Sequence, residues 1–284
     1  MNKNVIIVGR GVAGKRYKKI IEKNHPSFQV SFWNRNKKIP QCSRIIIASS
    51  TKNHFKDFLS SYKSCSRILI EKPITPKRND LNEIIKIAKA NKIFICTGDQ
   101  FQFSDLITDI KKKIRSFNSS KKVDISIEYK DSLQNVTKNQ ADSYFYDKDS
   151  GGVLYTFSHA YFVLTKIFGN SLILTSAEII KSQENQYETF ASSNWTKKNM
   201  RVNVVTDCAN RGLEFKLAID QKYTYDFING EMISFDLKKD EYSKNDRDSL
   251  IKRNIDQFIN DKFTNQFEIS QKALDYIWSV KEWN

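Results

Sequence analysis

The sequence predicts an α/β protein: an N-terminal Rossmann-type doubly wound parallel sheet, followed by an α+β domain with a largely antiparallel, open sheet. Three observations lead to this prediction. Short β-branched runs alternate with amphipathic stretches in the first part of the chain, a glycine-rich turn follows the first run, and several strand-like runs succeed one another in the second part. Strand–helix alternation is typical of parallel sheets covered on both faces, whereas successive strands pair antiparallel.

The first domain is predicted over residues 1–117. Its strands are continuous apolar runs, which indicates burial on both faces; they cover Val5–Val8, Phe28–Trp33, Arg44–Ala48, Arg67–Ile70 and Ile93–Thr97. Apolar residues at helical spacing predict helices over Lys15–Lys23, Asn53–Tyr62, Leu81–Ala90 and Asp105–Ile114.

The second domain is predicted over residues 118–284, after the polar junction Ser116–Lys122. Val123–Tyr129 alternates as a strand does, and Val153–Phe168 has the pattern of one helix. Further strands are expected over Leu172–Ile180, Arg201–Asp207, Leu213–Ile219, Lys222–Ile228 and Glu231–Phe235, with a hairpin turn at Asn229-Gly230 between the last two. Two helices end the pattern, Ser249–Asn260 and Ile269–Val280.

The composition excludes several classes of protein. In 284 residues, 39% are hydrophobic and 12% aromatic, which suffices for packed cores and argues against disorder. No run approaches the roughly 20 apolar residues of a membrane span, and the run Val5–Val8 is too short for a signal peptide. We therefore expect a cytoplasmic protein with no membrane partner.

The net charge of +15 does not by itself indicate a nucleic-acid partner. The lysines are spread along the chain instead of forming the clustered stripe of a nucleic-acid binder, so we expect none; a positive field does help to attract an anionic ligand. The four cysteines have no C-x-x-C spacing. They predict reduced core thiols, with neither a metal site nor a disulfide framework.

A glycine-rich motif with the spacing G-x-G-x-x-G follows the first strand and precedes the first helix: Gly9-Arg10-Gly11-Val12-Ala13-Gly14. The first glycine permits a tight turn, the second lets the backbone approach a pyrophosphate, and the third allows close packing of helix on strand. The helix N-terminus then presents free N–H groups to the phosphates. The motif predicts a dinucleotide site.

The end of the second strand bears on the choice of cofactor. NAD sites place an acidic residue here to bind the ribose hydroxyls. This chain has Asn34 and Arg35 instead, and the cation suits a 2′-phosphate. The sequence therefore favours NADP over NAD.

A third motif, Glu71-Lys72-Pro73, directly follows the fourth strand. A lysine at the carboxyl end of a strand lies where open α/β sheets bind their ligands, and it can bond a substrate hydroxyl or carbonyl. Glu71 supplies a nearby opposite charge.

Together these motifs resemble the glucose–fructose oxidoreductase / inositol dehydrogenase / MocA (Gfo/Idh/MocA) family. The resemblance continues through Ala48–His54, Thr97-Gly98-Asp99-Gln100 and Gly151-Gly152-Val153-Leu154, and it covers nearly the whole chain. It implies a Rossmann domain, an α/β domain whose open sheet commonly mediates oligomerisation, and hydride transfer between NAD(P) and a sugar, cyclitol or similar molecule. It also implies that a set of residues lies along the cofactor: Ser49, Thr51, His54, Glu71, Lys72 and Gln100. By the same resemblance, Lys72 reaches the substrate and the Lys72–Pro73 bond can be cis.

The chain departs from the family at its acidic positions. The family commonly has Asp four residues before a motif histidine, His159 here, and another Asp three residues after it; these positions are Tyr155 and Phe162. As an i, i+4 pair on the expected helix, Tyr155 and His159 would share one face and present two proton-handling groups to one pocket. The opposing interpretation is that His159 only packs in an apolar helix.

The sequence thus predicts an NADP(H)-dependent oxidoreductase of carbohydrate metabolism, acting on a small sugar, a nucleotide-linked sugar or a related carbonyl compound. Lys72 would polarise the reacting oxygen, and His159 or Tyr155 would pass the proton. Two alternatives remain open: a reductase of an imine or tetrapyrrole-type substrate, and a cofactor-binding sensor without catalysis. We also expect a homo-oligomer, a dimer or tetramer, joined through an apolar face of the strands between Leu172 and Phe235.

Overall fold

The computed structural model describes residues 3–34, 37–117, 121–137, 143–183, 186–234, 239–241, 246–262 and 266–283. The chain forms two compact units. The first comprises Met1–Asp99 with Lys252–Gln271, and the second comprises Gln100–Ile251 with Lys272–Asn284. These units differ from the predicted domains, because the helix Asp105–Ser116 groups with the second unit and a C-terminal segment groups with the first.

The first unit contains a five-stranded parallel sheet in the order β2-β1-β3-β4-β5. Its strands are β1 (Asn4–Val8), β2 (Gln29–Phe32), β3 (Arg44–Ile47), β4 (Arg67–Ile70) and β5 (Phe94–Thr97). The connecting helices are α1 (Val12–Asn24), α2 (His54–Ser61) and α3 (Arg78–Ala90). Every residue of β3 is buried, as its run of three isoleucines predicts for a strand covered on both faces. The predicted doubly wound sheet is confirmed.

The C-terminal helices α8 (Arg247–Ile259) and α9 (Phe267–Lys281) explain the discontinuous first unit. The amide of Asn254 donates to the Thr97 carbonyl (3.2 Å), and the side-chain oxygen of Gln266 accepts from the Thr97 N–H (2.7 Å). These contacts tie the helices to the end of β5. The sequence prediction treated each domain as one continuous segment and therefore missed this return.

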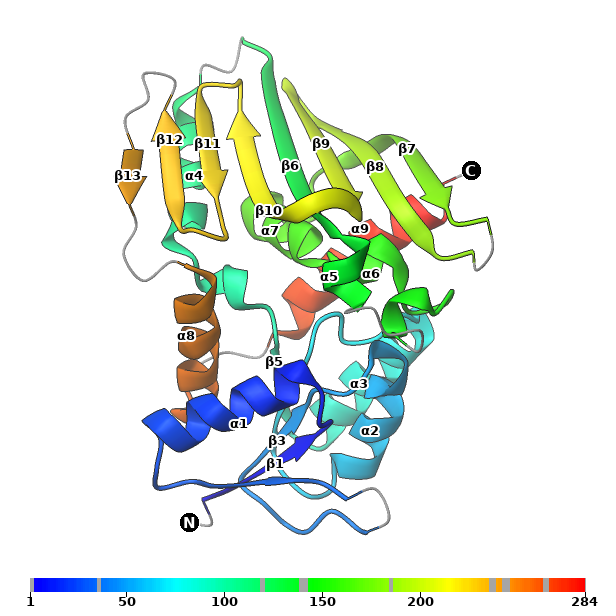
Figure 1. The fold of residues 1–284 in the computed structure, drawn as a ribbon, viewed down its shortest axis with the longest axis vertical. Helices are drawn as coiled ribbons and strands as arrows, with labels where there is room; N and C mark the ends of the chain where they lie inside the picture. The colour runs from blue at the N-terminus through cyan, green and yellow to red at the C-terminus, as the bar shows by residue number, and fades with distance from the viewer. Residues whose placement is uncertain are drawn as a thin grey trace. The chain divides into compact units, whose positions relative to one another are not determined.

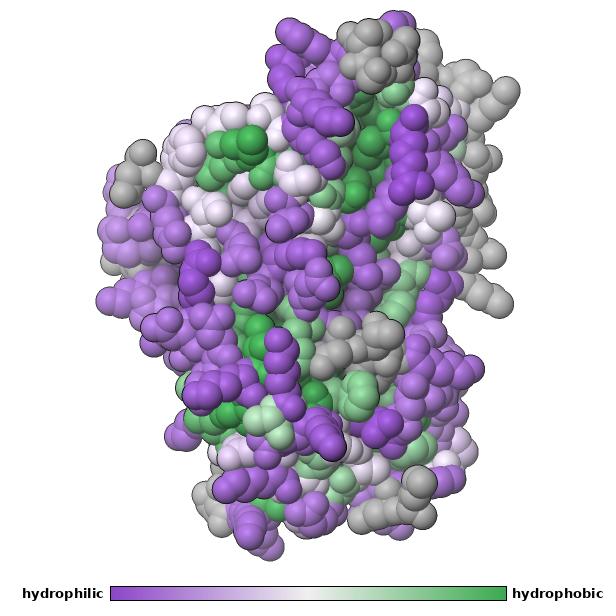
Figure 2. All heavy atoms as spheres, turned by 180° about the vertical axis from the view of Figure 1, so that it is seen from behind, coloured by the Kyte–Doolittle hydropathy of each residue, from purple (hydrophilic) through white to green (hydrophobic). Residues whose placement is uncertain are grey.

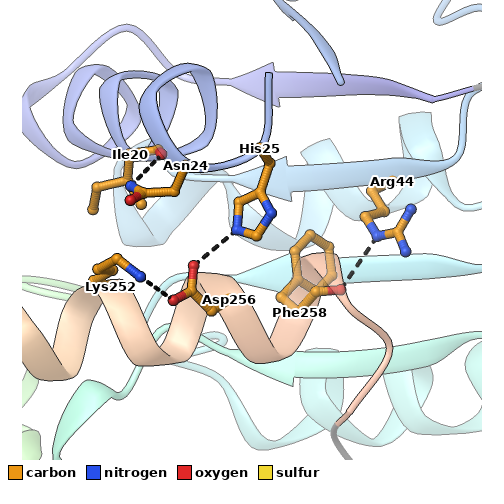
Figure 3. A network of polar contacts seen from close by, with 7 residues as sticks. All are labelled: Ile20, Asn24, His25, Arg44, Lys252, Asp256 and Phe258. Carbon is orange, nitrogen blue, oxygen red and sulfur yellow. Dashed lines mark hydrogen bonds and ion pairs between the residues drawn. The ribbon is translucent and has the colours of Figure 1, made fainter. Parts of the chain in front are cut away.

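Charged contacts on α8 strengthen the same attachment (Figure 3). Asp256 accepts from His25 (2.8 Å), which follows α1, and is also bonded to Lys252 one helical turn away. The guanidinium of Arg44 donates to the Phe258 carbonyl (3.2 Å). The His25 and Arg44 contacts hold the C-terminal half of α8 against the end of α1 and the start of β3.

The second unit contains an eight-stranded sheet in the order β13-β12-β11-β10-β6-β9-β8-β7 (Figure 1). All neighbours are antiparallel except the parallel pair β6 and β9. Its strands are β6 (Val123–Ser132), β7 (Ile173–Lys181), β8 (Glu188–Lys197), β9 (Met200–Asp207), β10 (Ala209–Ile219), β11 (Tyr223–Asp226), β12 (Glu231–Ser234) and β13 (Lys239–Glu241). The largely antiparallel sheet is confirmed. The sequence analysis did not predict β8 or β13. In β8, Ser, Thr and Asn residues interrupt the alternation of apolar and polar side chains that marks a strand.

The stretch Val153–Phe168 is not one helix, so that prediction is wrong. It forms α6 (Gly152–Thr156) and α7 (His159–Phe168), separated by Phe157 and Ser158. Neither Gly nor Pro marks the break in the sequence. Tyr155 and His159 therefore lie in different helices and do not share one helix face.

The two faces of the large sheet differ in polarity. Ile125, Ile127 and Tyr129 of β6 are buried, and Tyr129 stacks on Phe157 beside α7 with ring centroids 4.7 Å apart. The alternate face has polar contacts. Arg201 pairs with Asp124 (2.7 Å) and Asn203 bonds to Asn194 (3.0 Å) across neighbouring strands, and Lys130 pairs with Glu128 (2.6 Å) within β6. Helix α7 thus covers the apolar side of β6, whereas Ile173 and Ile180 of β7 are exposed, and the expected interface through this sheet stays a prediction.

Figure 2 shows hydrophilic side chains over most of one face of the molecule, with hydrophobic ones in small groups between them. Within the described ranges, no helix has the length and apolar character that a membrane crossing requires. The same residues contain no cluster of three side chains suited to a metal ion.

Candidate functional site

The candidate site lies at the carboxyl edge of the parallel sheet. The chain passes from β1 to β2 on one side and continues to β3 on the other, so the loop after β1 lies where the strand order reverses. Crevices at such positions are where open α/β sheets bind ligands. A cavity of about 540 Å³ is present here; it is lined by Gly9, Arg10, Gly11, Trp33, Asn34, Ala48, Ser49, Ser50 and Asn53.

The space around the three motif glycines differs from one position to the next. Gly9 has a φ of +108°, and a Cβ there would lie 2.4 Å from the Ala48 carbonyl oxygen. A Cβ on Gly14 would lie 2.2 Å from the Gly9 oxygen, which shows how closely α1 packs on the turn. A Cβ on Gly11 would meet no atom within 4 Å. The first and third positions exclude side chains for packing, whereas the space beside Gly11 is open for a ligand.

The N-terminus of α1 has no side-chain cap. Its N-cap residue is Gly11, no acidic residue lies in its first turn, and the exposed Val12 is its first residue. Unpaired N–H groups and the positive end of the helix dipole attract anions at such a terminus. The cradle therefore fits the pyrophosphate of a dinucleotide.

The end of β2 forms another part of the cavity wall. Trp33 and Asn34 line the cavity, and the Trp33 indole donates to the Lys37 carbonyl (2.8 Å). Arg35, which the sequence assigns to a 2′-phosphate, lies outside the described residues. The cofactor preference is therefore not tested by this geometry.

The loop after β3 is held by its own polar contacts. The hydroxyl of Ser49, which lines the cavity, donates to Asp57 on α2 (2.6 Å). Thr51 begins a 3₁₀ turn and is buried. His54 is only 1% exposed, and its two ring nitrogens lie 2.9 Å from the Ser49 carbonyl oxygen and 3.0 Å from that of Pro73. Burial lowers the pKa of His54. This histidine thus joins the loops after β3 and β4.

The loop after β4 contains the Glu71-Lys72-Pro73 motif, and its Lys72–Pro73 bond is cis. One carboxylate oxygen of Glu71 accepts from the Lys72 N–H (3.1 Å). The other accepts from the hydroxyl of Tyr17 on α1. Burial first, and then the Glu71 carboxylate, raises the pKa of Tyr17 well above its usual value. The half-buried Lys72 is thus attached to a fixed backbone.

Tyr17 is a site residue that the sequence analysis missed. It lies one helical turn before the buried Ile21, on the face of α1 that packs against the sheet. A tyrosine on the buried face of a helix usually has a hydrogen-bond partner for its hydroxyl, so the position of Tyr17 on α1 could have indicated a buried polar contact.

We expect Tyr17→Phe to lower the free energy of unfolding by about 1–3 kcal/mol, because the half-buried Glu71 carboxylate loses a hydrogen-bond donor. Denaturant unfolding followed by circular dichroism measures the change. Tyr62→Phe is the matched control, since Tyr62 lies in the same unit and stacks on Phe58. An equal effect of the two substitutions would contradict the role assigned to the Tyr17 hydroxyl.

The remaining predicted residues belong to the second unit. Gln100 is buried and begins a short 3₁₀ helix (Gln100–Phe103). His159 is 3% exposed within an aromatic cluster, with its ring 4.9 Å from Phe101 and 6.1 Å from Tyr129. Packing thus accounts for much of its environment.

Tyr155 has different neighbours. It is 3% exposed, and the ammonium of Lys281 lies 4.4 Å from its ring centroid. Lys281 in turn pairs with the buried Glu188 (2.7 Å). Burial raises the pKa of the Tyr155 phenol above its usual range. Because Lys72 and these two residues belong to separate units, their convergence on one reacting atom stays a prediction.

No family model matches the chain, and no curated protein matches its sequence. Solved structures do share its fold. The UDP-N-acetylglucosamine 3-dehydrogenase of Acidithiobacillus ferrooxidans is 14% identical, with a TM-score of 0.74 over 99% of this chain and 97% of that one. Biliverdin reductase of Synechocystis sp. PCC 6803, solved with biliverdin and NADP+, is 13% identical, with a TM-score of 0.71 over 99% and 98%.

The myo-inositol 2-dehydrogenase of Lactobacillus plantarum is a third similar structure, 14% identical with a TM-score of 0.71 over 99% of this chain and 97% of that one. At these identities the likeness shows the fold alone. The two-domain fold implied by the resemblance to the glucose–fructose oxidoreductase / inositol dehydrogenase / MocA family is thereby confirmed over nearly the whole chain.

Proposed function

We propose that this protein is an NAD(P)(H)-dependent oxidoreductase of the Gfo/Idh/MocA family. The observation that supports this most strongly is the glycine cradle, in which Gly9 and Gly14 are closed to side chains while the space beside Gly11 is open. The uncapped N-terminus of α1 adds the anion-binding feature that a pyrophosphate needs. When bound, the nicotinamide supplies or accepts the hydride, and the protein supplies position and proton management.

The proposed substrate is a small sugar, a nucleotide-linked sugar or a related carbonyl compound. Lys72 polarises the reacting oxygen, because its ammonium extends from a loop that Glu71 and Tyr17 hold in place. His159 or Tyr155 passes the proton. Two of the similar structures are dehydrogenases of a nucleotide sugar and of a cyclitol, which supports this class of substrate.

A second candidate is a reductase of a less hydroxylated substrate, such as an imine or a tetrapyrrole. The aromatic surroundings of His159 favour it, together with the buried Tyr155 and Phe162 at the positions where family members commonly have Asp. A biliverdin reductase has the same fold. A cofactor-binding sensor without catalysis is the alternative from another class.

Oxidation of NADPH, followed by absorbance, separates these candidates when it is screened against matched sets of sugars, nucleotide sugars, imines and linear tetrapyrroles. We expect turnover with a member of the carbonyl set. Turnover restricted to imines or tetrapyrroles supports the second candidate. Tight NADPH binding without turnover on any set supports the sensor.

The cofactor preference gives a separate expectation. NADPH should bind more tightly than NADH, because Asn34 and Arg35 replace the ribose-binding acid. Arg35→Ala should weaken NADPH binding about tenfold or more, since a charge-assisted hydrogen bond is worth roughly 1.5–3 kcal/mol. Calorimetric titration measures both, with Lys38→Ala as the control for loss of a neighbouring cation. A clear preference of the unmodified protein for NADH would contradict the assignment.

A homo-oligomer remains part of the proposal. Its interface would be the exposed side of the large sheet, where Ile173 and Ile180 of β7 are uncovered and charges such as Arg201 and Asp124 are paired. Light scattering at micromolar concentration and moderate salt should show a dimer or tetramer. A monomer alone under these conditions would count against the proposal.

A further inference from the structure

The structure places two of the four cysteines next to each other, at the amino ends of neighbouring parallel strands. Cys42 precedes β3 and Cys65 precedes β4, and both are half-buried, whereas Cys96 and Cys208 are buried. The expectation of four core thiols is therefore wrong for this pair. C-x-x-C spacing did not reveal it, because the two cysteines are joined by sheet pairing and not by sequence proximity.

The strand register brings the pair together. β3 and β4 pair Ile45 with Ile68, and the same offset aligns Cys42 with Cys65. This alignment holds beyond the ends of the two strands. The Cys42 N–H donates to the carbonyl of Ser64 (3.0 Å), the residue before Cys65, and this is the hydrogen bond expected in a parallel sheet when Cys42 and Cys65 are paired. Neighbouring strands are about 4.7–4.9 Å apart, within the Cα separation of about 4.4–6.8 Å that disulfides span.

The two thiols also differ in acidity. The neighbouring Cys65 thiol lowers the pKa of Cys42, whereas the neighbouring Cys42 thiol, followed by burial, raises the pKa of Cys65. The more acidic member of the pair is the better source of the nucleophilic thiolate. Cys42 is therefore suited to attack an oxidant as the thiolate, and Cys65 is suited to attack the oxidised Cys42 sulfur afterwards.

We propose that Cys42 and Cys65 form an oxidation site at which a peroxide converts the two thiols to a disulfide. The Cys42 thiolate attacks one peroxide oxygen and breaks the O–O bond, which leaves a sulfenic acid on Cys42 and a hydroxide that takes up a proton as water. The Cys65 sulfur then attacks the Cys42 sulfur and breaks the S–O bond, and the departing hydroxyl takes the Cys65 thiol proton and leaves as a second water. Two electrons pass from the pair of sulfurs to the peroxide, and one S–S bond forms.

The test treats the folded full-length protein with hydrogen peroxide, removes the peroxide with catalase, and counts thiols after denaturation. We expect the number of titratable thiols to fall from four to two. Peptide mapping without reductant should find the Cys42 and Cys65 peptides linked, with their combined mass lower by two hydrogen atoms. Dithiothreitol should restore all four thiols.

Cys208→Ser is the matched control, because Cys208 is a buried thiol in the other unit. This variant should still form the Cys42–Cys65 link, whereas Cys42→Ser and Cys65→Ser should form none while keeping the circular dichroism spectrum of the folded protein. Retention of four thiols after peroxide would overturn the proposal. A linked peptide that contains Cys96 or Cys208 in place of either member would overturn it as well. Mapping of the unmodified protein decides these outcomes even if a variant fails to fold.

Discussion

Lys72→Ala should lower turnover by about 10²–10⁴-fold, the usual worth of general acid–base assistance, with little change in affinity for the cofactor. The residue directly follows β4 at the carboxyl edge of the sheet. Its N–H is bound by Glu71, which Tyr17 holds in turn, so the side chain starts from a fixed point. A group that acts on the reacting oxygen contributes to turnover more than to binding of the nucleotide.

Steady-state kinetics with the best substrate from the screen measures the loss, and calorimetry measures NADPH affinity. Lys77→Ala is the control, since Lys77 is an exposed lysine in the same loop region. Unchanged turnover in Lys72→Ala, or an equal loss in both variants, would contradict the role of Lys72.

The proton carrier is identified by two substitutions that preserve packing. His159→Phe keeps an aromatic ring beside Phe101 and Tyr129 but removes the titrating nitrogens. Tyr155→Phe removes only a hydroxyl. A large loss of turnover in one variant and not in the other assigns the proton to that residue, and small losses in both would contradict a proton-transfer role for either residue.

Gly11→Val should weaken NADPH binding by roughly a hundredfold, about 2.7 kcal/mol, whereas the poorer N-cap should lower the free energy of unfolding by only about 1 kcal/mol. A Cβ at this position meets no protein atom within 4 Å, and the backbone φ of −70° suits a side chain. The added isopropyl group would occupy only the space that the pyrophosphate needs. Substitution of Gly9 or Gly14 would not give an equivalent test. A Cβ at either position would clash with the backbone, so a loss of NADPH binding could not be separated from a loss of folding.

Gly212→Val is the matched control, since a Cβ at Gly212 also meets nothing within 4 Å but lies in β10 of the other unit. Calorimetry and a thermal melt of both variants complete the comparison. Equal NADPH affinity in the Gly11 variant and the unmodified protein would show that the Gly9–Gly14 turn does not bind the pyrophosphate.

The parallel sheet was the most predictable part of the fold. Continuous apolar strands such as Arg44–Ile47 and the glycine motif are local signals, and the structure has both where they were expected. The break between α6 and α7 was not predictable, because an apolar stretch without Gly or Pro reads as one helix. The attachment of Lys252–Gln271 to the first unit depends on long-range contacts with Thr97, which no local pattern encodes.

The candidate site was partly predictable for the same reason. The roles of the three glycines follow from spacing alone, and they agree with the space around each. The Tyr17–Glu71 contact and the two carbonyl partners of His54 join segments far apart in the chain, so only the fold reveals them. Arg35 and the convergence of Lys72 with His159 stay predictions.

The central claim, that the Gly9–Gly14 turn binds a nicotinamide dinucleotide, is tested most directly by a crystal structure of the protein grown with NADPH. The account predicts density for the pyrophosphate over the N–H groups that begin α1, beside Gly11, with the adenosine end toward Asn34. A complex in which NADPH lies elsewhere, or crystals that remain free of it at saturating concentration, would contradict the account.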